Sequence, residues 1–196
     1  MAKLYFRYGV MGSGKSDDLI RTDYNYKEKG MNTIAFKPRV DTREGTDKCI
    51  IKSRTGKALE GIWLDKKDNI VDIIIDAKKL KKIDVILVDE SQFLTSKQVN
   101  ELNEIAHLLD IPVMCYGLKN NFKAELFEGS SCLLALADDI QEIKSICWCG
   151  RKATQNARIV NGVLSRHGDE IQIGGNESYV ALCSEHYILQ TLKKDK

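Results

Sequence analysis

The hydrophobic positions up to about residue 145 fall into two alternating kinds of segment. Short apolar runs rich in β-branched and aromatic residues predict strands, and they cover residues 4–8, 33–36, 85–88 and 112–116. Longer stretches with apolar residues three or four positions apart predict helices, and they cover residues 15–29, 69–80 and the stretch after Thr95. The isoleucine triplet inside 69–80 is also compatible with a strand. Strands that alternate with helices predict an α/β fold, with a parallel sheet flanked by helices.

Local signals mark the ends of several predicted elements. Gly30 stands where the first helix should end, and Gly117 is expected to break the fourth strand. Thr95 and Gln98 match a capping box, in which two side chains satisfy backbone N–H groups at the start of a helix. The run at 85–88 contains no polar residue and ends at two acids. This pattern is typical of a central parallel strand that is buried on both faces.

The sequence pattern changes near residue 140. Helical periodicity fades there, and short β-like runs appear together with clustered Cys and His residues. A chain of 196 residues can bury a full core but is short for two independent domains. We therefore predict a main domain over residues 1–142 and a small β domain over residues 143–196.

The charged residues give no sign of a polymeric or membrane partner. Lys and Arg number 30 and Asp and Glu number 28, which leaves a net charge of +2, and the basic residues are scattered along the chain. The N-terminus lacks the apolar segment and cleavage site of a signal peptide, and no apolar run approaches the roughly 20 residues of a membrane span. We therefore expect a cytoplasmic protein that binds neither a nucleic-acid polymer nor a membrane.

A glycine-rich motif follows the first predicted strand and opens the first predicted helix. It matches the pattern G-x-x-x-x-G-K-[ST] and consists of Gly9, Val10, Met11, Gly12, Ser13, Gly14, Lys15 and Ser16. In this context the backbone N–H groups and the helix N-terminus bind phosphate oxygens. Lys15 would bridge the outer phosphates and Ser16 would bind Mg²⁺. Unless it is a chance match in a glycine-containing turn, the motif predicts a nucleoside triphosphate site but does not identify a reaction.

Two acids directly follow the apolar run at 85–88. Asp89 and Glu90 therefore lie at the carboxyl end of a strand, which is the edge of an open α/β sheet where ligands bind. Because successive strand residues point in opposite directions, we predict that Asp89 binds Mg²⁺ beside Ser16 and that Glu90 acts as a general base. In many ATPases the second acid activates water, so the pair does not separate a kinase from a hydrolase. The acids could also simply solvate the end of a strand.

Three of the six cysteines cluster with a histidine near the C-terminus. Cys147 and Cys149 form a C-x-C pair, and Cys183 and His186 form a C-x-x-H pair. Three thiolates and one imidazole suit tetrahedral Zn²⁺ and leave no position for substrate, which indicates a structural metal. The metal would stabilise a segment that has little core of its own. Because C-x-C is tighter than the usual C-x-x-C, two core cysteines and a surface histidine are the alternative.

The phosphate loop, the paired acids and the cysteine cluster together resemble one family, the type II thymidine kinases, over nearly the whole chain. The family's D-x-R motif corresponds to residues 41–43, its D-E-x-Q-F motif to residues 89–93, and its Y-G-L-x-x-x-F motif to residues 116–122. The spacing of the cysteine cluster is similar to that of the bacterial branch. The resemblance implies a P-loop NTPase-like fold with a zinc-binding, lid-bearing β domain. It also implies transfer of the γ-phosphate of ATP to the 5′-hydroxyl of deoxythymidine.

The resemblance assigns roles that the residue pattern alone leaves open. It implies that Glu90 is the base for the nucleoside hydroxyl, that Asp41 helps to organise the Mg²⁺ site and that Arg43 approaches the transferred phosphate. It extends the ATP site to the acidic motif, namely Asp89, Glu90, Ser91 and Gln92. The implied nucleoside pocket contains Phe93, Leu118, Phe122, Ile171, Ile173, Gly174 and Tyr179. The last four residues of this set belong to a loop that closes over the nucleoside.

Two places depart from the family pattern. Gly12 stands where an Asn or an aromatic residue is expected, which adds backbone freedom to the phosphate loop without removing an N–H donor. Lys119, Asn120 and Asn121 stand where bacterial members carry Arg, Thr and Asp. The loop stays polar, but an ammonium replaces the planar fork of an arginine.

The resemblance further implies a homotetramer and feedback inhibition by dTTP. One alternative is a kinase of nucleoside monophosphates with a zinc-bearing lid, but such lids lie in mid-chain and are rich in arginine, whereas only Arg166 lies near the loop here. A second alternative is a nucleotide-driven switch whose zinc ribbon binds DNA. The nearly neutral charge, the small size and the lack of an N-K-x-D motif argue against that switch.

Overall fold

A six-stranded sheet forms the centre of the protein, whose computed structural model describes residues 1–40, 47–168 and 178–192. In spatial order the strands are β5 (Ile62–Leu64), β2 (Thr33–Pro38), β6 (Val85–Val88), β7 (Val113–Gly117), β1 (Leu4–Tyr8) and β8 (Asp139–Glu142). All neighbouring strands run parallel. The carboxyl ends of the strands therefore meet at one edge, and the predicted α/β fold is confirmed.

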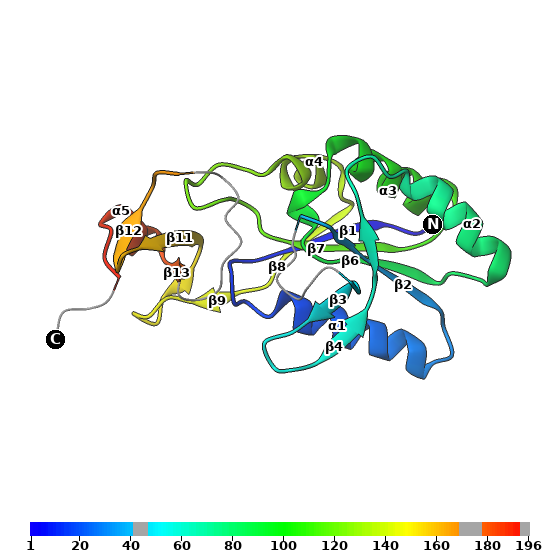
Figure 1. Ribbon diagram of the computed structural model, residues 1–196, viewed down its shortest axis with the longest axis horizontal. Coiled ribbons are helices and arrows are strands. Elements are labelled where there is room, and N and C mark those ends of the chain that lie inside the picture. Colours follow the sequence, from blue (N-terminus) through cyan, green and yellow to red (C-terminus); the bar gives the residue numbers. More distant parts are fainter. Residues whose placement is uncertain (41–46, 169–177, 193–196) are drawn as a thin grey trace.

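Helices cover both faces of this sheet (Figure 1). One face carries α1 (Lys15–Glu28), and the other carries α2 (Ile70–Leu80), α3 (Ser96–Leu108) and α4 (Glu128–Leu136). Val85 and Leu87 of β6 pack in the core that contains residues of α1, whereas Ile86 and Val88 pack in the core beneath the other helices. Strand β6 is thus buried on both faces, as its uninterrupted apolar sequence predicts.

Local side-chain chemistry explains where two helices begin. Thr95 Oγ1 accepts from the Gln98 N–H, and Gln98 Oε1 accepts from the Thr95 N–H, each at 3.2 Å. This confirms the predicted capping box of α3. Asn69 Oδ1 accepts from the Asp72 N–H at 3.2 Å and caps α2 in the same way. The segment with the isoleucine triplet is therefore a helix and not a strand.

The segment between β2 and α2 contains elements that the hydrophobic pattern did not predict. β3 (Ile50–Lys52) and β4 (Ala58–Glu60) form an antiparallel hairpin beside α1 (Figure 1). With three residues each, these strands and β5 are too short to show an alternating pattern. Fully buried Ile51 attaches the hairpin to the core that contains α1. A smaller difference concerns Gly117, which is the last residue of β7 and not a break before its end.

Beyond β8 the chain forms two small antiparallel sheets at one end of the molecule (Figure 1). The first sheet pairs β9 (Ser145–Ile146) with β10 (Lys152–Ala153). The second sheet places β11 (Gln155–Val160) between β12 (Val163–Ser165) and β13 (Tyr179–Leu182). Helix α5 (Ser184–Ile188) follows β13. The expected small β domain is present, whereas the division at residues 142 and 143 stays a prediction. Among the described residues, no helix combines the length and apolar character needed to cross a membrane.

We expect Thr95→Ala to destabilise the protein, because it leaves the Gln98 N–H at the start of α3 without its side-chain acceptor. The free energy of unfolding should fall by about 1 kcal/mol, as measured by urea denaturation. Ser96→Ala is the matched control, since it removes a hydroxyl from the next, exposed residue. Equal losses in the two variants would contradict the stabilising role of the capping box.

Candidate active site

The glycine-rich segment joins β1 to α1 at the carboxyl edge of the central sheet, as predicted. The Lys15 side chain is buried, and its Nζ donates to the carbonyl oxygens of Gly9 and Val10 at 3.3 and 2.9 Å. Ser16 Oγ lies 3.3 Å from each carboxylate oxygen of Asp89. The fold therefore brings the loop's cation and hydroxyl to the acid that follows β6.

Asp89 is a buried carboxyl group, with 4% of the residue exposed. Its burial and the adjacent charge of Glu90 raise its pKa to about 7, although Lys37 and Lys15 act in the opposite direction. A buried carboxylate of this kind is stabilised by a proton or by a cation. A hydroxyl and a carboxylate are the oxygen ligands that Mg²⁺ prefers, so Ser16 and Asp89 fit an Mg²⁺ ion that accompanies a nucleotide.

Glu90 is held in a sparsely populated backbone conformation, with φ 49° and ψ 39°. Such a left-handed residue costs roughly 1–3 kcal/mol and persists only where its surroundings hold it in place. Gln92 Nε2 donates to Glu90 Oε2 at 2.6 Å, and Gln92 Oε1 accepts from the Leu118 N–H at 3.0 Å. Because a backbone N–H can only donate, this second contact turns the amide NH₂ of Gln92 toward Glu90. Gln92 thus orients the carboxylate of Glu90.

A glycine at the end of β7 makes this arrangement possible. A Cβ on Gly117 would lie 2.6 Å from Ser91 Oγ and 2.8 Å from Gln92 Oε1, so only glycine allows this close approach. Ser91 and Gln92 are almost fully buried, at 0% and 2% exposed. Gln92 therefore acts through Glu90 in this structure, and the contact of Ser91 and Gln92 with ATP stays a prediction.

The described residues of the predicted nucleoside pocket make separate local contacts. Phe93 makes an edge-to-face contact with Phe127, with ring centroids 5.7 Å apart. Phe122 is buried, and the guanidinium carbon of Arg158 lies 5.2 Å from its ring centroid. Arg158 is also the register partner of Tyr179 between β11 and β13. Half-buried Leu118 follows β7 and is tied to the acidic motif through Gln92.

Several predicted site residues lie outside the described part of the chain, namely Asp41, Arg43, Ile171, Ile173 and Gly174. Conversely, the sequence analysis did not identify Phe127 or Arg158. Neither residue belongs to a recognisable motif, and each contacts a predicted pocket residue only because the chain folds back on itself.

The four residues of the cysteine cluster come together as predicted. Cys147 and Cys149 lie in the turn between β9 and β10, while Cys183 and His186 lie at the start of α5 and within it. Their ligand atoms all lie within 4.8 Å of one another. The two Sγ atoms of Cys149 and Cys183 are 3.9 Å apart, and His186 Nδ1 is 3.4 Å from Cys147 Sγ and 3.3 Å from Cys183 Sγ.

These distances fit a tetrahedral zinc ion. Zinc–ligand bonds of usual length imply about 3.8 Å between two sulfur atoms and about 3.6 Å between sulfur and nitrogen. Burial acts to raise the pKa of Cys147, but the backbone N–H groups of Cys149 and Cys183 and the ring of His186 lower it to about 6. The Trp148 ring stacks on His186 with centroids 4.1 Å apart and restricts the orientation of the imidazole. The cluster is therefore compatible with a structural zinc ion.

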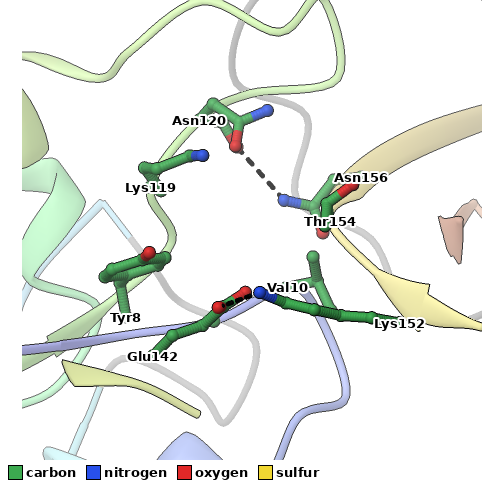
Figure 2. Close-up of a pocket in the computed structure, with 9 residues that line it drawn as sticks. Tyr8, Val10, Lys119, Asn120, Glu142, Lys152, Thr154 and Asn156 are labelled. Carbon is green, nitrogen blue, oxygen red and sulfur yellow. Dashed lines mark hydrogen bonds and ion pairs between the residues drawn. The ribbon is translucent and has the colours of Figure 1, made fainter. Parts of the chain in front are cut away.

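The small β domain is hydrogen-bonded directly to the phosphate loop. Asn156 of β11 is buried; its Oδ1 accepts from the Met11 N–H at 2.8 Å, and its Nδ2 donates to the Asn120 carbonyl at 3.1 Å (Figure 2). Val10 packs in the hydrophobic core that contains Cys147 and Cys183. The same domain that carries the cysteine cluster therefore supports one arm of the phosphate loop.

A polar cavity of about 100 Å³ lies beside this junction (Figure 2). Glu142 of β8 and Lys152 of β10 form an ion pair at its wall, and Lys119 lies over the ring of Tyr8. Among the described residues, the lining includes Gly9 and Val10 of the phosphate loop and does not include Phe93, Leu118, Phe122 or Tyr179.

Comparisons with known proteins agree with this geometry. The family model described as thymidine kinase matches residues 2–187. A thymidine kinase of Zymomonas mobilis is 48% identical over 189 residues, which cover 96% of this chain and 97% of that protein. Thymidine kinases of Haemophilus influenzae and Rhodopirellula baltica are each 45% identical over 188 residues, covering 95% of this chain and 96% and 88% of their own lengths. The similarity spans both the central sheet and the small β domain.

Ionised Asp89 should destabilise the nucleotide-free protein, because its pKa of about 7 exceeds the usual 3.8. Between these pH values the folded state binds more protons than the unfolded state, so stability falls as the pH rises. At about pH 8 Asp89→Asn should exceed the wild type in free energy of unfolding, by on the order of a few kcal/mol, and the difference should shrink toward about pH 4. Urea denaturation across this pH range measures the difference in free energy of unfolding between Asp89→Asn and the wild type. Asp76→Asn, which changes an exposed acid, is the control. If the difference for Asp89→Asn does not depend on pH, the raised pKa of Asp89 is wrong.

We expect the purified protein to contain zinc bound by the cysteine cluster, and Cys183→Ser to lose that metal. The small β domain should then be less stable, because the metal joins its two ends. Elemental analysis measures the zinc content, and thermal denaturation measures the stability. Cys132→Ser, which changes a half-buried cysteine outside the cluster, should keep both. Equal zinc content in the two variants would contradict the assignment.

Proposed function

The chain belongs to the thymidine kinase family and is an enzyme that phosphorylates thymidine, and we propose that it uses the γ-phosphate of ATP with Glu90 as the base. One observation carries this proposal. Ser16 Oγ lies 3.3 Å from the carboxylate oxygens of Asp89, and Glu90 is the next residue. A phosphate loop, oxygen ligands for a metal and a candidate base therefore share one edge of the sheet.

The phosphate loop would bind ATP through the residues at positions 9–16. Lys15 Nζ, which rests on the carbonyl oxygens of Gly9 and Val10, would turn to the outer phosphates when the nucleotide enters. Ser16 and Asp89 would hold Mg²⁺ together with Asp41, and the ion supplies positive charge to the phosphate oxygens. Lys15 and Arg43 would add to that charge, which stabilises the transferred phosphoryl group.

Glu90 would accept the proton of the 5′-hydroxyl while the hydroxyl oxygen bonds to the γ-phosphorus. The bond between that phosphorus and the bridging oxygen breaks, and ADP leaves. Gln92 supports this step because its amide orients the carboxylate through a 2.6 Å hydrogen bond. A fixed carboxylate avoids part of the entropy cost of reaching the reactive geometry.

The thymine and sugar would bind beside the aromatic residues of the pocket. Phe93, Leu118, Phe122 and Tyr179 would form walls of the pocket, and Ile171, Ile173 and Gly174 belong to the proposed lid over the nucleoside. A lid that excludes water favours transfer of phosphate to the alcohol over hydrolysis. The similarity to thymidine kinases supports thymidine as the substrate of this pocket.

The remaining features of the proposal follow the family. Cys147, Cys149, Cys183 and His186 would hold a structural Zn²⁺ ion in a domain that begins near residue 143. The active enzyme would be a cytoplasmic homotetramer, and dTTP would inhibit it as the end product. Size-exclusion chromatography with light scattering, together with inhibition assays, tests the assembly and the feedback.

A coupled assay of ADP release tests the substrate and the base. With ATP and Mg²⁺, thymidine should produce ADP faster than other deoxynucleosides. Glu90→Gln should lower kcat by about 10²–10⁴-fold, because the amide cannot accept the proton. Glu104→Gln on the exposed face of α3 is the matched control and should keep the wild-type rate.

Each possible failure of this assay has a distinct meaning. If thymidine releases no more ADP than the other nucleosides, the proposed selectivity is wrong. If thymidine is phosphorylated but Glu90→Gln turns over at the wild-type rate, only the assignment of the base is wrong.

A further inference from the structure

A guanidinium group that belongs to none of the recognised motifs lies against the phosphate loop. Arg54 occupies the turn between β3 and β4, and its Nη1 lies 3.0 Å from the position that a Cβ on Gly12 would take. The central carbon of the guanidinium lies 3.5 Å from the same position. The cationic end of Arg54 therefore covers the loop at Gly12.

The hairpin that carries Arg54 is held on the helix that begins at the phosphate loop. Ile51 is fully buried in the core that contains Leu19 and Ile20 of α1. Next to Arg54, the Thr55 hydroxyl donates to a carboxylate oxygen of Asp17 in the first turn of α1. These contacts keep the turn of the hairpin beside the loop, so the approach of Arg54 follows from the packing of its neighbours.

Among the described residues, Arg54 differs from several other arginines because it has no acidic partner. Arg7, Arg21, Arg39 and Arg151 each form an ion pair with Asp or Glu. Within residues 1–40, 47–168 and 178–192, no hydrogen bond or ion pair engages the guanidinium of Arg54. An unpaired cation that the fold keeps beside a phosphate loop is suited to bind an anion there.

The glycine at position 12 provides the space for this approach. Gly12 has φ +75°, a conformation that glycine adopts without strain, and any side chain there would contact the guanidinium of Arg54. An Asn or aromatic side chain, which the family pattern favours at this position, would occupy the space that Arg54 now uses. The absence of a side chain at Gly12 therefore leaves the space in which the guanidinium of Arg54 lies.

We propose that Arg54 is a phosphate-binding residue of the nucleotide site, whose guanidinium donates hydrogen bonds to oxygens of the triphosphate held by the loop. The planar fork of arginine matches two phosphate oxygens at once, and such charge-assisted bonds are stronger than neutral ones. The inference rests on the proposed binding of ATP at residues 9–16. It adds a ligand from a segment of the chain that none of the recognised motifs contains.

Binding of ATP with Mg²⁺, measured by titration calorimetry without thymidine, tests this role. Arg54→Ala should weaken ATP binding by about tenfold to a hundredfold, the range expected for a charge-assisted hydrogen bond. Arg54→Lys should fall between the wild type and Arg54→Ala, because it keeps the charge but loses the fork. Lys57→Ala removes an exposed positive charge from the same hairpin and should bind ATP as the wild type does.

The outcomes separate this inference from the function on which it rests. If the wild type does not bind ATP, the proposed nucleotide site is wrong. If the wild type binds ATP and Arg54→Ala matches Lys57→Ala, Arg54 is a solvated surface residue and the inference is overturned. In kinetic assays, Arg54→Ala should raise the KM for ATP, while the KM for thymidine stays within about twofold of the wild-type value. An equal rise in the two KM values would also overturn the inference.

Discussion

The burial of Asp89 beside the half-buried Glu90 at the end of β6 is the constraint on which the site depends. A strand covered on both faces places Asp89 where it has little access to water, and this burial together with the charge of Glu90 raises the pKa of Asp89 to about 7. Ionised carboxylates at such a place require cations or hydrogen-bond donors. The surrounding elements supply them: Lys15 and Ser16 come from the phosphate loop, and the Gln92 amide binds Glu90. These cationic and hydrogen-bonding groups meet at one edge because the strands of the sheet run parallel.

The small β domain contributes to the site through the backbone of the phosphate loop. Asn156 engages the Met11 N–H, so this N–H is directed at the domain and is not available to a phosphate oxygen. Val10 is buried in the same domain's core. The segment of the loop at Val10 and Met11 is therefore held by contacts with the small β domain. A metal bound by the cysteine cluster would stabilise the domain that carries Asn156 and would thereby support the phosphate loop.

The central fold and the location of the motifs within it were predictable from the sequence, because both depend on local pattern. An apolar run, a capping box or a glycine-rich loop carries its signal within a few residues, and β6, α3 and the loop at residues 9–16 appear as predicted. The short hairpin with Arg54 and the contacts of Asn156, Phe127 and Arg158 were not predictable. Each depends on packing between segments that lie far apart in the chain, and none carries a periodic pattern of its own.

The departures from the family pattern are accompanied by local contacts in this chain. Gly12 leaves the space that the guanidinium of Arg54 occupies. Lys119, in the place of an arginine, lies 5.8 Å from the ring centroid of Tyr8, which suits a compact ammonium. The side-chain amide of Asn120 donates to Gln155 Oε1 at 2.9 Å, and its backbone carbonyl accepts from Asn156 at 3.1 Å, so Asn120 is hydrogen-bonded to the small β domain through both groups. Substitutions around an active site of fixed chemistry are tolerated where a neighbouring side chain takes up the changed volume, charge or hydrogen bond. A single departure is therefore better judged together with the side chain that contacts it than by comparison with the motif alone.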